Sequence, residues 1–305
     1  MKKKLLKAVE ILLLLLQLSC NKTKESKTTL LLDWVPNVNH IPLIVGIEKG
    51  FFLDQTIDLD LKFVQDPPSV LSYLSATNTP LGIYYYPSAL HSSRFAKNFK
   101  IIGKLFDEPL IGLLCKNYQI NGSKLVTYAD PFSIRLIESL QSQGVNFSSI
   151  HISHLDLLTH FMFCSADTIT SYLNAERASL EKKRIPYFFF TWKDLSIPSY
   201  PELVFIAKKS FLIDKPSFKN GFRKALIQSI QFCKANPKEA LEIYLERFPE
   251  KKRNQDYEKR SLELTLDLFS TTQIFDEKKL EDFERWFFRD ENPSRSFMYK
   301  KILEN

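Results

Sequence analysis

Short apolar segments alternate with longer amphipathic ones along the first third of this chain, and this alternation limits the folds open to it. The strands expected there are Thr29–Leu32, Leu59–Val64, Leu81–Tyr85 and Lys100–Leu105. The helices expected between them are Pro42–Lys49, Pro68–Ser75 and Ser88–Ala96. Because strands separated by helices usually pair in parallel, the pattern predicts an α/β fold with a doubly wound sheet.

A second cycle of the same kind follows an apolar strand expected at Ile111–Lys116. Its strands are expected at Lys124–Tyr128, Ile150–Ser153, Ala166–Ser171 and Tyr187–Thr191, with helices at Phe132–Gln143, Leu155–Cys164 and Leu173–Lys183. A strand at Glu202–Ala207 can then return to the first unit, and the remainder is expected to be helical, at Ser217–Asn236, Pro237–Phe248, Asp256–Phe269 and Lys278–Phe288.

The two cycles together predict two doubly wound α/β domains joined by a two-strand hinge. Domain one comprises residues 30–112 and 205–305, and domain two comprises residues 113–204. Ligands of open parallel sheets bind beyond the carboxyl ends of the strands, so two facing sheets predict a binding cleft between the domains. Closure of the hinge then traps the ligand.

The amino terminus has the pattern of an export signal. Basic residues at the start precede an apolar run, Ile11 to Leu16, which is too short to span a bilayer. Ser19 followed by Cys20 is similar to a lipoprotein cleavage box, so residues 1–20 are expected to be a lipoprotein-type signal and Cys20 the lipidated residue. Residues 21–29 then form a flexible tether, and the protein lies on the periplasmic side of a membrane. The alternative is an ordinary cleaved signal with an incidental cysteine.

Charge and cysteine content exclude several classes of protein. The net charge is +7, and the five charged residues of the signal contribute +3 of it, so the mature chain has no need of a nucleic-acid partner. The remaining cysteines, Cys115, Cys164 and Cys233, lie far apart without the spacing of a metal site. We expect them to be buried free thiols.

A polar loop follows the first strand and carries the best candidate binding residues. Asp33 and Trp34 end the apolar run, and Asn37 and His40 follow within the loop. A cluster of aromatic and hydrogen-bonding groups at a strand-to-helix connection suits a flat, polar, ring-shaped ligand. Asn37 has an alternative role as the cap of the helix that follows, and His40 as a partner of the backbone.

Four stretches, in order, resemble the periplasmic substrate-binding proteins for thiamine-pyrimidine precursors. That family also includes a riboflavin-precursor binder and a eukaryotic enzyme that makes the thiamine pyrimidine. The stretches are residues 32–52, residues 82–87, residues 105–109 and residues 172–176 with 197–204. The resemblance implies a type II periplasmic binding protein fold and the capture of a small heteroaromatic ligand.

The resemblance also implies roles for individual side chains. Trp34 matches a stacking platform, and Tyr85 matches an aromatic that closes the other side of the ring. Strand alternation prevents Tyr84, Tyr85 and Tyr86 from all facing the ligand; Tyr85 is favoured, and Tyr84 is kept as a second candidate. Glu176 matches an acidic position that reads an exocyclic amine and a ring nitrogen. The alternatives are a core position for Trp34 and a solvated helix position for Glu176. The family usually places an aromatic where this chain has Leu173, which leaves the ligand open.

The Tyr128–Pro131 turn differs from the family in another way. Relatives often have a glycine-containing loop there that binds polar ligand atoms, whereas this chain has Asp130 as an expected N-cap. A phosphate at this helix start is disfavoured by the negative charge of Asp130.

An enzyme is not expected from these residues. The eukaryotic synthase anchors its cofactor through a lysine and has a nearby histidine, but this chain has Tyr84 and Ser88 at those positions, and residues 197–202 have no cysteine. Without the amine no Schiff base forms, so neither a catalytic residue nor a cofactor is predicted. His151, His154 and His160 have Asp156 as their sole neighbouring carboxylate, and no metal site is predicted from them.

The sequence therefore predicts a lipid-anchored, monomeric substrate-binding component of an ABC importer, with an inner-membrane ABC permease as its partner. The expected ligand is a small heteroaromatic such as a thiamine-pyrimidine precursor. Alternative ligands are a riboflavin precursor, taurine or another sulfonate. A further alternative is a lipoprotein whose degenerate cleft serves contacts with other proteins.

Overall fold

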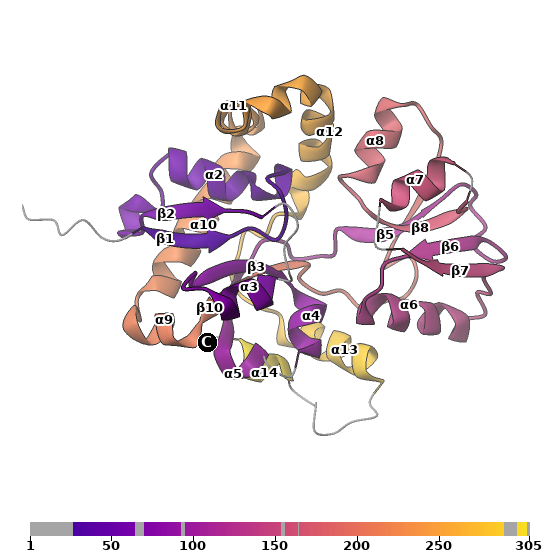
Figure 1. Ribbon diagram of the computed structural model, residues 1–305, viewed down its shortest axis with the longest axis horizontal. Helices are drawn as coiled ribbons and strands as arrows, with labels where there is room; N and C mark the ends of the chain where they lie inside the picture. Colours follow the sequence, from indigo (N-terminus) through magenta and orange to yellow (C-terminus); the bar gives the residue numbers. More distant parts are fainter. Residues whose placement is uncertain are drawn as a thin grey trace, which may run out of the picture.

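The computed structural model describes residues 27–64, 70–92, 95–153, 156–163, 165–289 and 298–303. Two five-stranded sheets dominate these residues, each with helices packed against it (Figure 1). The expected signal and the lipidation site at Cys20 lie outside the described residues, as do His154 and Cys164. None of the described helices has the length and apolar character needed to cross a membrane.

The first sheet contains strands from both ends of the chain. Its order is β2-β1-β3-β10-β4. The bounds are β1 Thr28–Leu31, β2 Leu59–Lys62, β3 Leu81–Tyr85, β4 Phe99–Lys104 and β10 Leu203–Lys208. β1 pairs in parallel with β2 and β3, whereas β10 is antiparallel to β3 and β4.

The second sheet contains the middle of the chain. Its order is β7-β6-β8-β5-β9. The bounds are β5 Ile111–Cys115, β6 Lys124–Thr127, β7 Ser149–Ile152, β8 Thr168–Tyr172 and β9 Phe188–Thr191. β6 pairs in parallel with β7 and β8, whereas β5 is antiparallel to β8 and β9.

Both sheets are therefore mixed: the strands separated by helices pair in parallel, as expected, and the antiparallel pairs involve β5 and β10. The antiparallel members, β5 and β10, are the strands that enter each sheet directly from the other one. They need no helical crossover to bring the chain back to the same edge, so nothing forces them to run in parallel. The expected domain boundaries after residues 112 and 204 lie inside these two strands, each of which pairs within a single sheet.

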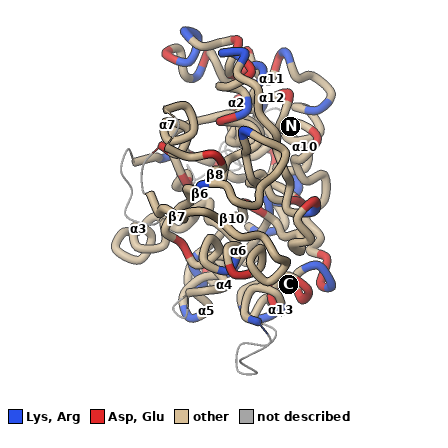
Figure 2. The backbone as a smooth tube through the Cα atoms, turned by 90° about the vertical axis from the view of Figure 1, so that its right-hand side faces the viewer, with Lys and Arg blue, Asp and Glu red and all other residues tan. Residues whose placement is uncertain are grey.

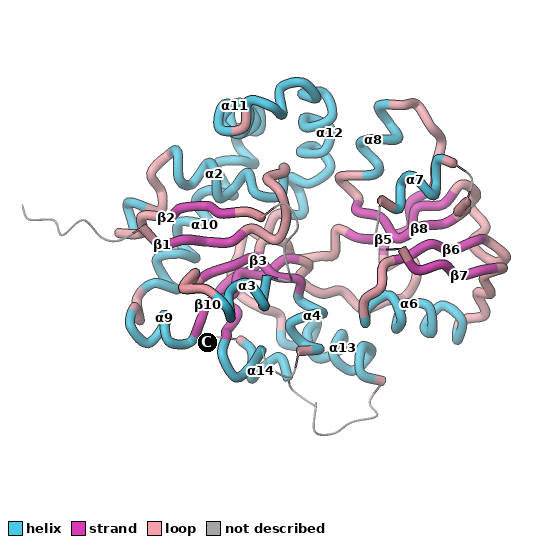
Figure 3. The backbone as a smooth tube through the Cα atoms, in the orientation of Figure 1, coloured by secondary structure: helices cyan, strands magenta, loops and turns pink. Residues whose placement is uncertain are grey.

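Most of the helices confirm the expected pattern, with shifts of a few residues at their ends (Figure 3). Ser88–Ala96 is divided between two helices, and Thr28 and Thr29 of the expected tether belong to β1. The helices are α2 Ile41–Glu48, α3 Val70–Ala76, α4 Tyr86–His91, α5 Phe95–Asn98, α6 Pro131–Ser142, α7 Leu157–Met162, α8 Glu176–Lys182, α9 Lys209–Asp214, α10 Phe218–Ala235, α11 Pro237–Arg247, α12 Gln255–Thr265, α13 Glu277–Phe288 and α14 Met298–Ile302. Single turns of 3₁₀ helix are η1 Val38–His40, η2 Leu53–Gln55, η3 Pro249–Asn254 and η4 Leu266–Leu268.

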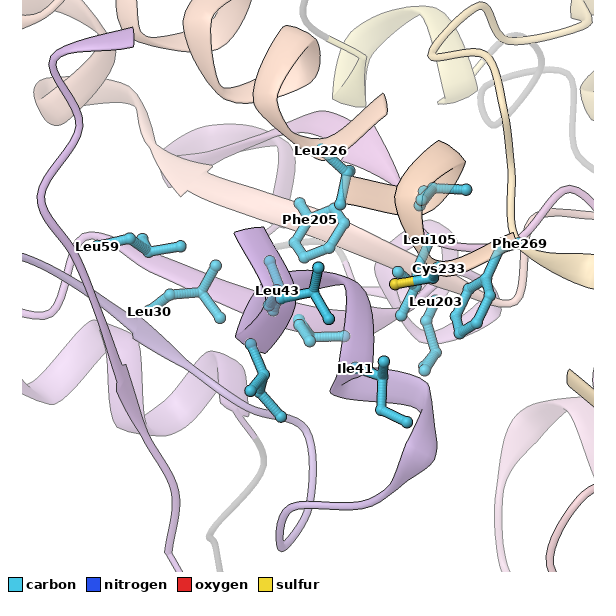
Figure 4. Close-up of a cluster of buried hydrophobic side chains, with 14 of the residues drawn as sticks. Leu30, Ile41, Leu43, Leu59, Leu105, Leu203, Phe205, Leu226, Cys233 and Phe269 are labelled. Atoms are coloured by element: carbon cyan, nitrogen blue, oxygen red, sulfur yellow. The ribbon is translucent and has the colours of Figure 1, made fainter. Parts of the chain in front are cut away.

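The strands of the first sheet bury side chains on both faces. Leu30 and Phe205 pack with α2 and α10 in one apolar cluster, part of which is shown in Figure 4. Their neighbours Leu31 and Val204 belong to the opposite cluster, with α3, α4 and α13. Successive residues of a strand point to opposite faces, so a strand buried on both sides has the continuous apolar run seen in the sequence.

The second cluster also joins the two sheets. It includes Phe132 of α6 and Leu113 of β5 together with Phe283 of α13. A smaller cluster on the other face of the second sheet contains Leu114, Ile169 and Phe161. The C-terminal helices thus hold one side of the second domain against the first.

Polar and reactive side chains are distributed as expected for an apolar interior. Cys115 and Cys233 are buried free thiols, as predicted, and burial raises their pKa values to about 11 and about 12. On the side shown in Figure 2, Lys and Arg residues are interspersed with Asp and Glu residues along the outer helices.

Candidate functional site

The parallel strands of the two sheets end at a common place. β1 leads to Asp33, β3 ends at Tyr85, and β8 ends at Tyr172. We define the inter-sheet junction as the acidic and tyrosine side chains gathered there. They are Asp33, Tyr85, Tyr128, Asp130, Tyr172, Glu176, Tyr200 and Glu202.

The junction is bridged by a buried amide cluster. Asn174 follows β8 of the second sheet, and its Nδ2 donates to Asn39 Oδ1 of η1 at 2.6 Å. The same nitrogen donates to Thr265 Oγ1 of α12 at 2.9 Å. These bonds place the ends of β1 and β8 against each other, as open-sheet binding sites require.

The loop after β1 is held rigid by its own polar side chains. His40 is fully buried, and its Nε2 lies 2.8 Å from Asp33 Oδ1. Its Nδ1 accepts the backbone N–H of Asn37 at 3.2 Å, so the other nitrogen carries the proton and donates to Asp33. Asn37 Oδ1 in turn accepts from the N–H of Asn39 at 2.9 Å and caps η1. Both ring nitrogens of His40 are therefore used by the chain, and its role here is to position Asp33.

Trp34 stands out from this rigid loop. Its side chain is 53% exposed, in contrast to Leu32 at 1%, so the structure places it outside the core. A large indole held in water by a fixed backbone has an open face for contact with a ring. The expected stacking role thus has the exposure that it needs.

The three consecutive tyrosines have different surroundings. Tyr86 is fully buried among the helices below the first sheet. The ring of Tyr84 stacks on that of Phe95, with ring centroids 6.0 Å apart. Tyr84 also forms a hydrogen bond with Ser88; these residues stand where the resemblance places the lysine and the histidine of the synthase. Tyr85 alone reaches the junction, where its hydroxyl lies 3.0 Å from that of Tyr200. The structure therefore brings Tyr85, and not Tyr84, together with the other candidates.

Glu176 occupies the first residue of α8. Its carboxylate accepts from the Tyr172 N–H at 2.8 Å and from the Ser171 hydroxyl at 3.3 Å. Burial raises its pKa to about 7, although these hydrogen bonds oppose the shift. The carboxyl is half-buried rather than solvated, and it also raises the pKa of Tyr257 in α12.

Glu202 is an acid of the junction that was not predicted as a site residue from the sequence; the tyrosines Tyr128, Tyr172 and Tyr200 were not predicted as site residues either. It is fully buried, and neither carboxylate oxygen has a hydrogen-bond partner. Burial raises its pKa to about 8, and the negative charges of Asp130 and Asp33 push it in the same direction. The feature of the sequence that could have indicated Glu202 is a single acid between Pro201 and the apolar residues that begin β10.

The tyrosines share this acidic environment. The pKa of Tyr172 is raised well above its usual value, first by burial and then by Glu202. The pKa of Tyr200, which is fully buried, is likewise raised first by burial and then by the charge of Glu202. Every charged group that acts strongly on these hydroxyls is a carboxylate, so the junction has a negative potential.

Asp130 has the capping role predicted for it. Its Oδ1 accepts from the Ser133 N–H at 2.9 Å at the start of α6. Burial raises its pKa. The amino end of α6 is thereby occupied by a carboxylate of the chain itself, which leaves it poorly suited to a phosphate.

Two other places in the described structure, a small pocket and a pair of histidines, are poor candidates for a binding site. A pocket of about 40 Å³ beside β4, lined in part by Lys104, Asp107, Phe275 and Lys279, has space for a water molecule only. The rings of His151 and His160 lie 5.7 Å apart, but the described residues include no group of three ligands placed to hold a metal.

Two mixed α/β domains with facing strand ends are the architecture of the periplasmic binding proteins, and solved structures of that class are similar to this one. The aliphatic sulphonate-binding protein SsuA of Escherichia coli superposes with a TM-score of 0.65 at 12% identity, over 92% of this chain and 99% of its own. A Candida albicans protein of the generic periplasmic binding protein fold, CA3427, has a TM-score of 0.62 at 14% identity, over 92% and 96%. At these identities the likeness concerns the fold alone.

Comparison of the sequence with protein families shows the family of this chain. The profile described as NMT1/THI5 like matches residues 37–240, and the chain belongs to this family. A formylaminopyrimidine-binding protein of Halalkalibacterium halodurans is 23% identical over 70% of this chain and 68% of its own. A 4-amino-5-hydroxymethyl-2-methylpyrimidine phosphate synthase of Legionella pneumophila is 26% identical over 82% of each chain. The family thus contains binders and enzymes named for related pyrimidines.

Proposed function

We propose that this protein is the substrate-binding component of an ABC importer and captures a thiamine-pyrimidine precursor between its two domains. The observation that carries this proposal is the exposed Trp34 beside Asp33, at the strand ends where the second sheet supplies Tyr172 and Glu176. An indole for the face of a ring and carboxylates for its edge are what a planar aminopyrimidine requires.

Each expected contact has a distinct chemical task. Trp34 and Tyr85 bind the two faces of the ring, and Asp33 and Glu176 accept hydrogen bonds from its amino group and its protonated ring nitrogen. The hydrogen bonds that already hold Asp33 and Glu176 in place reduce the entropy lost on binding. His40 and Asn37 support the loop from behind, and Tyr84 takes no part in binding.

Binding rather than synthesis is supported by the residues at two positions. The synthases resembled by this chain anchor their cofactor through a lysine, and Tyr84 stands at that position beside Ser88. A phenol cannot form the imine that an amine forms. Incubation with pyridoxal phosphate, borohydride reduction and mass spectrometry should give no single lysine of the chain that is labelled stoichiometrically; one such lysine would favour the enzyme.

Transport requires further features that belong to the proposal. The export signal and lipidated Cys20 would hold the mature protein at the outer face of a membrane, where a closed, ligand-bound form can dock on a permease. Metabolic labelling with a palmitate analogue tests the anchor, since a Cys20→Ala variant should lose the label and be released.

Calorimetry tests the central claim. Titration with 4-amino-5-hydroxymethyl-2-methylpyrimidine and with N-formyl-4-amino-5-aminomethyl-2-methylpyrimidine should give a dissociation constant in the micromolar range or below for at least one of them. Taurine and riboflavin are the comparison ligands. Tight binding of taurine alone would replace the pyrimidine with a sulfonate, and the absence of binding to all four would favour a degenerate cleft. Mass spectrometry of a gently purified sample identifies any ligand carried along.

A further inference from the structure

Glu202 has an unusual environment for a carboxylate. It is 0% exposed, and both of its oxygens lack a hydrogen-bond partner. A buried charge without a partner is costly, by several kcal/mol in real proteins. Such a group persists in a fold when it has a task that offsets the cost, and it is a frequent mark of a functional site.

The position of Glu202 relates it to the proposed binding site. It lies immediately before β10, in the segment through which the chain returns from the second sheet to the first. Its backbone oxygen accepts the N–H of Tyr86, so β3 and β10 hold it at the end of the first sheet. Its charge acts on Tyr85 and Tyr172, which come from opposite sheets and are both only half-buried.

The charges around Glu202 have one sign. Asp33 and Asp130 act on it most strongly among charged side chains, and neither neutralises it. Tyr200 and the backbone of Leu110 approach close enough to ease its ionisation without completing a hydrogen bond. Among the described residues, the charged side chains found to act on Glu202 are both carboxylates.

We infer that the inter-sheet junction selects a heteroaromatic ring that carries a positive charge or several N–H donors, and that Glu202 is the residue that imposes this selection. The inference rests on the proposed function, because it uses the same site. A cation bound against Tyr85 and Tyr172 gains from their ring faces and compensates the carboxylates behind them. An anion such as a sulfonate or a phosphate is repelled by the same groups, which is discrimination by charge.

Three probes with a common ring test the inference. They are 4-amino-2-methylpyrimidine carrying 5-aminomethyl (a cation), 5-hydroxymethyl (neutral) or 5-methanesulfonate (an anion). The wild type should bind the cation at least tenfold more tightly than the anion by calorimetry. The carboxyl of Glu202 is mostly protonated in the free protein at neutral pH, and a bound cation favours its ionisation. Glu202→Gln keeps the shape and removes this response, so it should reduce the preference at least fivefold. Glu246→Gln, at an exposed position of α11, should leave it unchanged.

Each possible result of these titrations leads to a different conclusion. If the neutral or the anionic probe binds but the cation is not preferred, charge selection is wrong and the proposed function survives. If no probe binds, both are wrong. If Glu202→Gln keeps the full preference, the selection belongs to another residue. Should Glu202→Gln fail to give a cooperative thermal transition, Glu202→Met, which leaves no buried polar atom at this position, replaces it with the same expected loss of preference.

Discussion

Asn174 donates a hydrogen bond to Asn39 across the two sheets, with the Nδ2 of one amide 2.6 Å from the Oδ1 of the other. The residues are 135 positions apart, and both side chains are buried. The bond joins the loop after β1 to the end of β8, the two segments that carry Trp34 and Glu176. It therefore fixes the distance between the two sides of the proposed site.

Removal of this amide should loosen the contact between the domains. Asn174→Ala loses the bonds to Asn39 and Thr265 and leaves the Asn39 oxygen buried without a partner, which costs about 1–3 kcal/mol of unfolding free energy. Urea denaturation measures the loss, and small-angle scattering should show a larger radius of gyration. Asn146→Ala, at an exposed turn of the second domain, is the control and should change neither quantity. An unchanged radius would mean that the amide stabilises without holding the domains together.

The buried histidine should matter for stability more than its exposed counterpart. His40→Phe fills a similar volume but removes the partners of Asp33 and of the Asn37 N–H, at an expected cost of about 1–3 kcal/mol. His91→Ala, at an exposed position, should stay within about 0.5 kcal/mol of wild type. Chemical denaturation measures the unfolding free energies of both variants and of the wild type. Equal stabilities would show that the loop does not depend on its histidine.

Substitution of Trp34 should weaken ligand binding without changing the stability of the fold. Because the side chain is 53% exposed, Trp34→Ala should leave the unfolding free energy within about 0.5 kcal/mol of wild type. Loss of a stacked ring should weaken pyrimidine binding by about tenfold or more, which calorimetry measures. Trp34→Phe keeps a flat ring and should recover part of the affinity. Wild-type affinity in the alanine variant would remove Trp34 from the site.

The acidic junction should make the unliganded protein less stable as the pH rises. The pKa of Glu202 is raised from 4.5 to about 8 and that of Glu176 to about 7, so the folded state binds more protons than the unfolded state between these limits. Stability then falls as the pH increases from about 4.5 to about 8. The other titratable groups that interact with Glu202 are Asp33, Asp130, Tyr85, Tyr172 and Tyr200.

Glu202→Gln isolates this effect. Urea denaturation at pH 5 and pH 8 should show a loss of stability in the wild type that is smaller in the variant, by on the order of a few kcal/mol. Glu246→Gln, an exposed acid of α11, is the control and should keep the pH dependence of the wild type. A wild type and a Glu202 variant with the same pH dependence would mean that the carboxylate is already neutralised by a neighbour.

Much of the fold was predictable because it is written in local patterns. The apolar run at Leu81–Tyr85 and the Asp130 cap of α6 depend on neighbours in sequence, and the structure confirms both. The antiparallel direction of β5 and β10 could not be predicted from the alternation of strands and helices, because the direction of a strand depends on where the chain enters the sheet. Among the site residues, Trp34 and Tyr85 could be named from a motif, whereas the partners of His40 and Tyr84 could not.

The sequence by itself determined the order of strands and helices, the family, and a polar loop with Trp34 at its centre, because each of these is encoded in residues close together along the chain. Only the tertiary structure decided that Tyr85 and not Tyr84 meets Tyr200 at the junction. It also decided that His40 bonds to Asp33, and that Glu202 is buried without a hydrogen-bond partner. The physical reason is that distant segments set the burial and the partners of a side chain. The pKa of Glu202 is raised first by burial beneath such segments and then by the negative charges of Asp130 and Asp33.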